Sequence, residues 1–93
     1  MKAVILTPAF RKMPRGQTKE IRAEAGAVIS RAQRDFGDPH RHSGLGMRNL
    51  PGGYFEVRVH LDIRLVFRDT PAGLLFDFAG DHNAVRRFIK DRV

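Results

Sequence analysis

The sequence predicts a single α+β domain in which helices pack on an antiparallel sheet. Residues 18–36 carry apolar side chains at helical spacing, which is typical of an amphipathic helix. Residues 54–79 form three successive segments in which apolar and polar side chains alternate, and only short turns separate them. Such segments form an antiparallel meander with one buried face. The length of 93 residues fits one domain over residues 1–93.

A short strand and two helical segments are predicted before the meander. Residues 3–6 are an apolar run, which suits a short buried strand. Residues 10–13 favour one helical turn, which the proline at position 14 stops. The long helix has Thr18 as its N-cap and ends at Gly37.

A long loop and a C-terminal helix complete the predicted fold. Residues 38–53 have no periodicity and are rich in glycine and proline, so they are predicted to form a loop. This loop is longer than most loops in compact domains, and long ordered loops are often functional. After the last strand, His82 or Asn83 begins a short helix whose apolar side chains face inward: Val85, Phe88 and Ile89.

The net charge points to a polyanionic partner. There are 17 Lys and Arg residues against 10 Asp and Glu residues, which gives a formal charge of +7. On a short chain this charge favours binding to nucleic acid, anionic lipid or an acidic protein. The sequence has no cysteine, which excludes a disulfide scaffold, thiolate zinc ligands and thiol catalysis. We predict no membrane segment and no signal peptide, and therefore a cytoplasmic location.

The apolar residues set the register of the first hairpin. A two-residue turn at positions 61–62 would place Val59 opposite Arg64 and mix the two faces of the sheet. A three-residue connection at positions 60–62 places Arg58 directly opposite Arg64 instead. It also pairs apolar side chains with one another: Val59 with Ile63, Val57 with Leu65 and Phe55 with Phe67.

The pair of Arg58 and Arg64 has a structural and a functional interpretation. Two like charges side by side on a sheet are unfavourable unless an anion lies between them, so removing one arginine should relieve repulsion. In the structural interpretation the long side chains splay apart on a solvated face, which Glu56 shares. In the functional interpretation they clamp a phosphate group, because guanidinium groups match phosphate oxygens well.

Four histidines are candidates for chemistry, and they lack the spacing of a metal site. His40 and His42 lie in the long loop, His60 lies at the hairpin turn, and His82 follows the last strand. Because there is also no acidic cluster, we predict no metal and no cofactor. The alternatives for His82 are to cap the last helix or to transfer a proton near neutral pH.

These residues suit one reaction, the cleavage of a phosphodiester without a metal ion. In that reaction a base activates the ribose 2′-OH, and an acid protonates the leaving 5′-oxygen. Arginines stabilise the negative charge that develops on the phosphorus group.

The order of the elements and three motifs resemble toxins of the RelE/ParE superfamily, from bacterial type II toxin–antitoxin modules. The resemblance covers nearly all of the chain, and the order and spacing of the matching segments together are fairly specific. These segments are LTPAF at positions 6–10, HSGLGMRNLPGGYFEVRVHLDIRLVFRD at positions 42–69 and FAGDHNAVRRFIK at positions 78–90. The resemblance implies a small α+β fold in which an N-terminal strand and helices pack on a twisted antiparallel meander, with a short C-terminal helix.

The resemblance also implies a toxin that a cognate antitoxin neutralises by wrapping it with an extended or helical segment. RelE-like members cleave mRNA in the ribosomal A site, whereas ParE-like members inhibit DNA gyrase and have no nuclease chemistry. We favour a RelE-like endoribonuclease that inhibits translation, because the charge and the histidines suit RNA. The alternatives are a ParE-like gyrase inhibitor and a degenerate module that only binds its antitoxin.

Candidate site residues follow from these positions. The candidate catalytic residues are Arg58, Arg64, His82, His42 and Asp62. The candidate RNA- and phosphate-binding residues are Arg48, Arg68, Arg86, Arg87 and Lys90. Two positions depart from the family pattern. Phe88 stands where many family nucleases carry a tyrosine, and Glu56 stands where several members have a basic residue.

Overall fold

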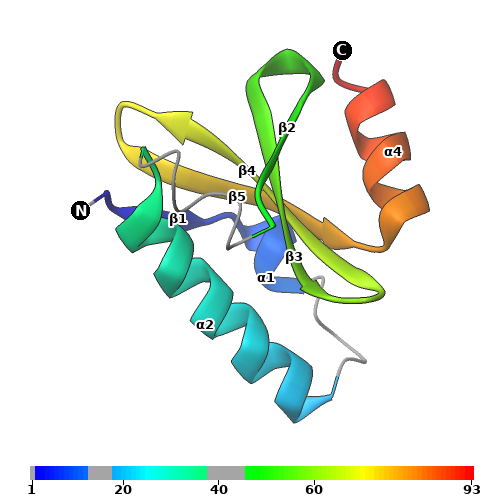
Figure 1. Cartoon of the computed structure of the whole chain (residues 1–93). Helices are drawn as coiled ribbons and strands as arrows, with labels where there is room; N and C mark the ends of the chain where they lie inside the picture. The colour runs from blue at the N-terminus through cyan, green and yellow to red at the C-terminus, as the bar shows by residue number, and fades with distance from the viewer. Residues whose placement is uncertain (1, 13–17, 38–45) are drawn as a thin grey trace.

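A mixed sheet forms the centre of the structure (Figure 1). The computed structural model describes residues 2–12, 18–37 and 46–93, and within these ranges five strands pair in the order β1-β5-β4-β3-β2. The strands are β1 (Val4–Leu6), β2 (Arg48–Leu50), β3 (Tyr54–His60), β4 (Ile63–Thr70) and β5 (Gly73–Gly80). The α+β class and the antiparallel meander of β3, β4 and β5 are confirmed.

Strand β1 makes the sheet mixed, because it pairs parallel to β5 whereas the other pairs are antiparallel. The sequence predicts this strand but not its partner. Val4 lies beside Leu74. The two chains approach so closely that a Cβ at Gly73 would lie 2.6 Å from the carbonyl oxygen of Ala3. Only glycine fits at that position, and its φ of 140° lies in the region that favours glycine.

The prediction of a loop over residues 38–53 is wrong for residues 48–50, which form strand β2. Residues 48–50 pair antiparallel with β3, and the 3-10 turn η1 (Pro51–Gly53) then reverses the chain. Three residues are too few to show a periodicity, so this strand depends on its partner β3 rather than on its own pattern. Residues 38–45 of the predicted loop lie outside the described residues.

Helices α1 (Pro8–Lys12) and α2 (Lys19–Asp35) cover one face of the sheet. Helix α1 begins two residues before the predicted turn, because proline suits the first position of a helix. Thr18 is the N-cap of α2, as predicted, and accepts a hydrogen bond from the N–H of Ile21 at 3.2 Å. The core on this face consists of Phe10, Ala32, Val57, Leu65, Phe67, Leu74 and Phe76.

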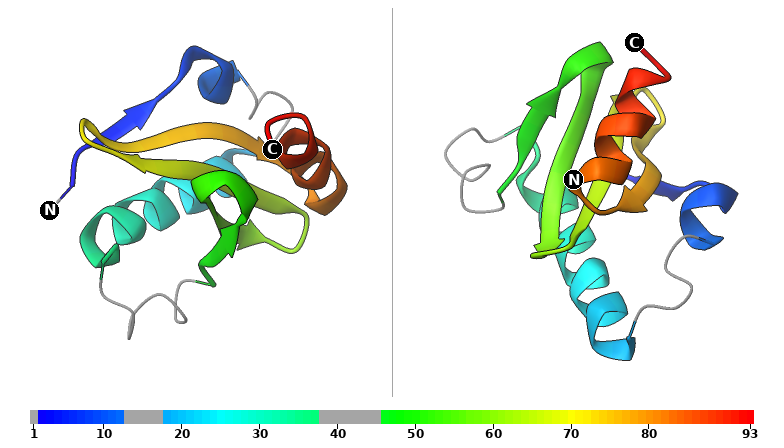
Figure 2. Two further views of the ribbon diagram at one scale, coloured as in Figure 1. Left: turned by 90° about the horizontal axis from the view of Figure 1, so that it is seen from above. Right: turned by 90° about the vertical axis from the view of Figure 1, so that its right-hand side faces the viewer.

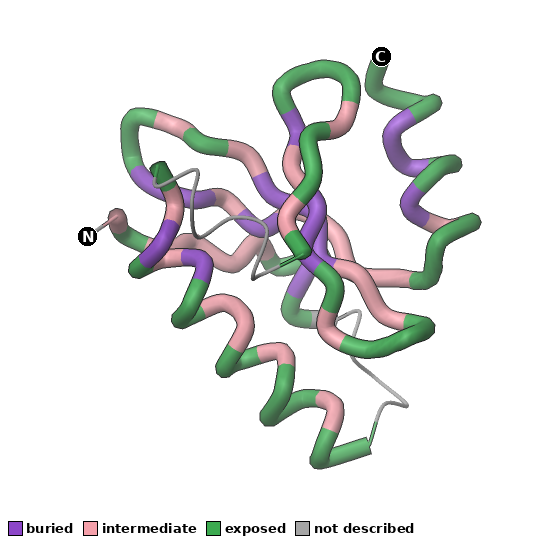
Figure 3. Tube along the Cα trace, viewed as in Figure 1, coloured by how far each residue is buried: buried purple, intermediate pink, exposed green. Residues whose placement is uncertain are grey.

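Helix α4 (His82–Lys90) covers the opposite face, so the prediction of a single buried face is wrong. Two further views show α4 set apart from α1 and α2 (Figure 2). Its three predicted inward residues pack with Tyr54 and Val66 of the sheet. Buried positions therefore run along the strands and recur in α4 (Figure 3). The alternation predicts that Val66 lies on the polar face of the sheet together with Arg64 and Arg68. That face is instead buried by α4 at Val66.

A β-bulge modifies the predicted register of the first hairpin. Three predicted pairs are confirmed: Phe55 with Phe67, Val57 with Leu65 and Arg58 with Arg64. The predicted pair of Val59 and Ile63 is wrong, because His60 takes the place opposite Ile63. The bulge between Arg58 and His60 absorbs one residue, so a two-residue turn joins the strands without mixing their faces.

A second bulge redirects the end of β5. Val66 pairs with Phe78, but the next residue of β4, Phe67, pairs with Phe76. Phe78 consequently packs on the α4 face, whereas the alternation predicts it on the same face as Phe76.

Within the described ranges, every helix is too short or too polar to cross a membrane.

Candidate functional site

Four side chains form a charged cluster on the sheet face that α4 covers: Arg48 of β2, Glu56 of β3, Arg64 of β4 and His82 at the start of α4. The Nε atom of Arg48 lies 3.0 Å from Oε2 of Glu56. The Nε atom of Arg64 lies 3.6 Å from Oε1 of the same carboxylate. The Nη1 atom of Arg64 lies 2.7 Å from Nδ1 of His82. The cluster is therefore one connected network across three strands and a helix.

The register of the sheet brings the charged cluster together. Arg48 stands opposite Glu56 in the pairing of β2 with β3. Arg64 stands opposite Gly80, the last residue of β5. Because α4 begins just after Gly80, its first residue is His82, which lies within reach of Arg64. Two predicted catalytic residues that are far apart in the sequence are thus in contact.

The contact with Arg64 determines which nitrogen of the neutral His82 ring carries the proton. Asp81 caps α4 by accepting a hydrogen bond from the N–H of Ala84 at 2.8 Å, so the alternative in which His82 caps the helix is wrong. A guanidinium group has no acceptor, so Nδ1 of His82 must accept the hydrogen bond from Arg64. The neutral ring in this arrangement carries its proton on Nε2.

Arg58 stands opposite Arg64, as predicted, and it is exposed. It has no ion-pair partner among the residues that the structure describes. Within this pair of arginines, the carboxylate of Glu56 offsets the charge of Arg64 alone, because its side chain, which is only 5% exposed, pairs with Arg64. The alternation predicts Glu56 on this face but not its pairing, because Arg48 lies in the predicted loop. Removing Arg64 would take a partner from a buried carboxylate, so we expect a loss of stability in place of the relief of repulsion.

A groove of about 450 Å³ runs between β2, η1 and α4 beside the charged cluster. Its polar lining includes Arg48, Glu56 and His82 of the cluster together with Arg86 and Lys90 of α4. Its apolar lining consists of Leu50, Pro51, Val85, Ile89 and Val93. Three of the predicted phosphate-binding cations therefore surround one groove with the predicted catalytic histidine.

The other predicted site residues lie elsewhere. Arg87 does not line the groove but lines a neighbouring hollow on α4 with Asn83, Arg86 and Lys90, of which the last two also line the groove. Asp62 lies in the first hairpin turn and lines a hollow that the groove does not include. Arg68 forms an ion pair with Asp77 at 2.9 Å, and this hydrogen bond raises the pKa of Arg68 above its ordinary value. His42 lies outside the described residues.

Phe88 belongs to the core on the α4 face. Its ring stacks on Phe78 with centroids 4.6 Å apart and meets Tyr54 edge-on at 5.7 Å. The guanidinium carbon of Arg92 lies 3.7 Å from the centroid of the Phe88 ring. The position at which many family nucleases carry a tyrosine is therefore filled here by a packed apolar ring.

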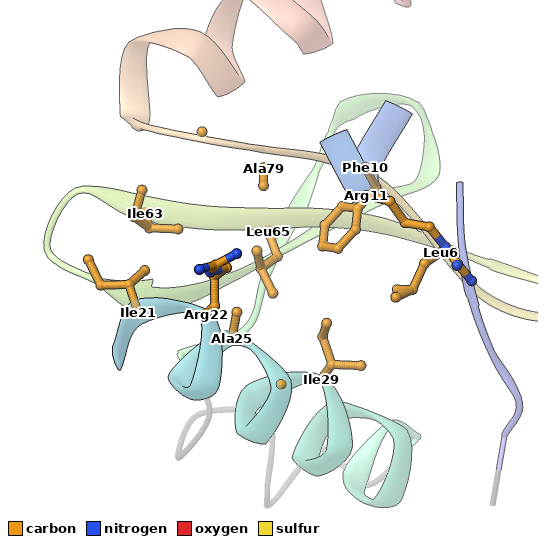
Figure 4. A pocket seen from close by; sticks show the side chains of 12 residues that line it. Leu6, Phe10, Arg11, Ile21, Arg22, Ala25, Ile29, Ile63, Leu65 and Ala79 are labelled. Atoms are coloured by element: carbon orange, nitrogen blue, oxygen red, sulfur yellow. The ribbon is translucent and has the colours of Figure 1, made fainter. Parts of the chain in front are cut away.

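A second cavity, of about 320 Å³, lies between α1, α2 and the sheet (Figure 4). Ile21, Ala25 and Ile29 of α2 line it opposite residues of the sheet such as Leu65. None of the predicted site residues that the structure describes lies in this apolar cavity. The lining of this cavity also includes Arg11 and Arg22, whereas the predicted phosphate-binding residues Arg48, Arg86 and Lys90 line the groove on the other face.

Comparisons with known proteins support the expected fold. No protein-family model matches the sequence, and no curated protein matches it significantly. The structure is similar to a chain of the YoeB-YefM complex from Staphylococcus aureus, with a TM-score of 0.64 and 18% identity over 88% of this chain and 98% of that one. YoeB is a RelE-family toxin. The chain has a RelE/ParE-like fold.

A second solved structure gives the same result for this RelE/ParE-like fold. It is the conserved hypothetical protein HP0894 from Helicobacter pylori, with a TM-score of 0.60 and 19% identity. The similarity covers 89% of this chain and 97% of that one. At such identities the likeness establishes the fold, so the chemistry of this chain has to be argued from its own side chains.

Proposed function

We propose that the chain is the toxin of a bacterial type II toxin–antitoxin module. In this proposal it acts in the cytoplasm as a ribosome-dependent endoribonuclease that cleaves mRNA without a metal ion. The observation that carries the proposal is the contact between Arg64 and His82, with Arg58 beside them and three further cations around the adjoining groove. The fold shared with YoeB, a protein solved in complex with YefM, supports a cognate antitoxin as the partner.

The proposed mechanism divides the work between arginines and histidine. Arg58 and Arg64 bind the scissile phosphate and stabilise the additional negative charge in the transition state. A bound phosphate oxygen is a stronger acceptor than an imidazole nitrogen, so Arg64 exchanges Nδ1 of His82 for the phosphate. The 2′-OH loses its proton to solvent water as its oxygen bonds to the phosphorus and the bond from phosphorus to the 5′-oxygen breaks. His82, once released, takes up a proton and donates it to that leaving 5′-oxygen.

The test is to induce the protein in bacteria and to measure translation and DNA supercoiling separately. We expect translation to stop, mRNA to be cut within codons on the ribosome, and supercoiling to remain unchanged. The matched variants are Arg58→Ala/Arg64→Ala, which removes the proposed clamp, and Arg68→Ala, which removes another arginine of β4. Loss of supercoiling with intact mRNA would contradict the proposal and identify a ParE-like gyrase inhibitor. Binding of the antitoxin without any toxicity would identify a degenerate module.

Binding of the free protein to single-stranded RNA is expected to fall steeply with salt. Displaced counterions drive such binding, and the slope of log K against log[salt] is roughly −0.7 for each phosphate contacted. The variant Arg86→Gln/Lys90→Gln removes two cations of the groove and is expected to reduce the slope by roughly one to two units. Fluorescence anisotropy across a salt series measures this slope.

The matched control for the salt series is Lys19→Gln/Arg22→Gln, which removes the same charge from exposed positions of α2. It is expected to leave the slope within the error of the wild-type value. Equal losses in the two variants, or weak RNA binding that salt does not change, would argue against the groove as the RNA-binding surface.

Cleavage of mRNA is expected to survive the chelation of divalent ions. Within the part of the chain that the structure describes, no group of three or more His, Asp or Glu side chains could hold a metal ion. The measurement is single-turnover cleavage in EDTA, with ribosomes kept intact by cobalt hexammine and checked by sedimentation. If the chemical step stopped on intact ribosomes, the metal-free mechanism would be wrong.

A further inference from the structure

Glu56 is a buried carboxylate in an otherwise cationic site. Among the described residues, only Glu56 and Asp35 are charged and buried. A buried carboxylate is unfavourable unless it is paired, and Glu56 pairs with one arginine through each oxygen. Its two partners differ greatly in exposure, because the side chain of Arg48 is 61% exposed and that of Arg64 is 13% exposed.

The pairing with Glu56 determines how Arg64 is oriented. A guanidinium group is planar, so two contacts on different nitrogens set the plane of the group. Arg64 has such contacts, since its Nε faces Glu56 and its Nη1 faces His82. Arg58 provides the comparison within the same sheet. It stands directly opposite Arg64, has no ion-pair partner among the described residues, and is exposed.

We propose that Glu56 is the positioning residue of this site: it holds the guanidinium of Arg64 so that Nη1 meets Nδ1 of His82. The proposal rests on the proposed function for its effect on the reaction, and on the geometry alone for its effect on the histidine. A carboxylate that lowers the positive charge of an RNA-binding face is otherwise unfavourable. In return, the guanidinium plane of Arg64 is already oriented for the phosphate oxygen that takes the place of Nδ1 of His82.

Glu56 does not act as the general base. Both of its oxygens face arginine nitrogens, and its side chain is 5% exposed. A base must reach the 2′-OH of the substrate directly or through one water molecule. A carboxylate at this site could position Arg64 or act as a general base. The contacts of Glu56 fit the first role, and the two roles give different results in an experiment.

The test uses Glu56→Gln, which keeps the size of the side chain and removes its charge. We expect the cleavage rate at saturating programmed ribosomes to fall roughly 10- to 100-fold, as for a misplaced catalytic group, with little change in the half-saturating concentration. The matched control is Asp77→Asn, because Asp77 pairs with an arginine of the same strand outside the charged cluster. We expect the control to change the rate less than about twofold.

A second measurement does not depend on ribonuclease activity. Nitrogen-15 NMR of the histidine rings, assigned with a His82→Gln variant, reports which ring nitrogen of His82 carries the proton. The wild-type protein is expected to show an unprotonated Nδ1 at neutral pH, and Glu56→Gln is expected to show a mixture of tautomers. Asp77→Asn is expected to match the wild type.

The outcomes separate this proposal from the proposed function. A changed tautomer in a protein without nuclease activity would support the role of Glu56 and contradict the ribonuclease. An unchanged tautomer and an unchanged rate would overturn the role of Glu56. Loss of the acidic limb of the rate–pH profile with an unchanged tautomer would identify a base and also overturn it. If Glu56→Gln does not fold, Glu56→Asp keeps the charge, withdraws the carboxylate by one methylene, and has the same expected results.

Discussion

Arg64→Ala is expected to lower the rate of mRNA cleavage by on the order of 100-fold, the scale of losing one preorganised donor of transition-state stabilisation. Arg64 is the most constrained of the candidate arginines, because it contacts both Glu56 and His82. The negative charge on the phosphorus group grows in the transition state, so a fixed cation contributes more there than in the ground state. Single-turnover cleavage on programmed ribosomes measures the effect.

The same substitution is expected to lower the free energy of unfolding by about 1–3 kcal/mol, because it removes a partner from the buried Glu56. Arg48 still pairs with that carboxylate, so the protein is expected to fold and to bind its antitoxin. Arg68→Ala is the matched control, since it also breaks an arginine–carboxylate pair of β4. A folded Arg58→Ala/Arg64→Ala variant with full toxicity would show that these arginines lie on a merely solvated face.

His82→Ala is expected to lower the cleavage rate by a factor similar to that of Arg64→Ala, and it is expected to change the pH profile as well. A residue that transfers a proton contributes typically 100- to 10,000-fold, and its own ionisation shapes the dependence of the rate on pH. Arg64 stays charged across the accessible pH range, so its removal should lower the whole profile without changing its shape. The measurement is the single-turnover rate from acidic to alkaline pH for each variant.

His60→Ala is the control for the histidine prediction. His60 lies at the end of β3, is exposed, and does not line the groove. We expect its removal to leave the rate and the pH profile unchanged. If His82→Ala retained the wild-type profile, then another group would transfer the proton and His82 would serve only to contact Arg64.

Alternation was sufficient to predict the first hairpin and the opposition of Arg58 and Arg64, although the turn has two residues where three were predicted. Both depend on neighbouring strands and on contacts close in sequence, which single-sequence patterns represent well. The inward residues of α4 were predictable for the same reason, because Val85, Phe88 and Ile89 recur at helical spacing.

The main feature that was missed is β2, because its three residues show no periodicity of their own. Residues 48–50 are a strand only because β3 lies beside them, and without β2 the partner of Glu56 was not visible. The contact between His82 and Arg64, in contrast, follows from the predicted meander, because the end of β5 lies beside β4. The sequence contains one indication of the charged cluster. Strand alternation places the acidic residue Glu56 on the same face as Arg58 and Arg64, and Glu56 lies at the centre of the cluster.

The parallel pairing of β1 with β5 sets the order in which the protein can be completed during its own synthesis. Until residue 74 has been made, Val4 has no neighbour in β5, and Phe10 lacks Phe76, whose ring centroid lies 5.7 Å from its own. Contacts so distant in sequence form late, and domains close when their last elements emerge. If the chain is the ribosome-directed toxin that we propose, the ribosome producing it is protected at least until β5 has been made.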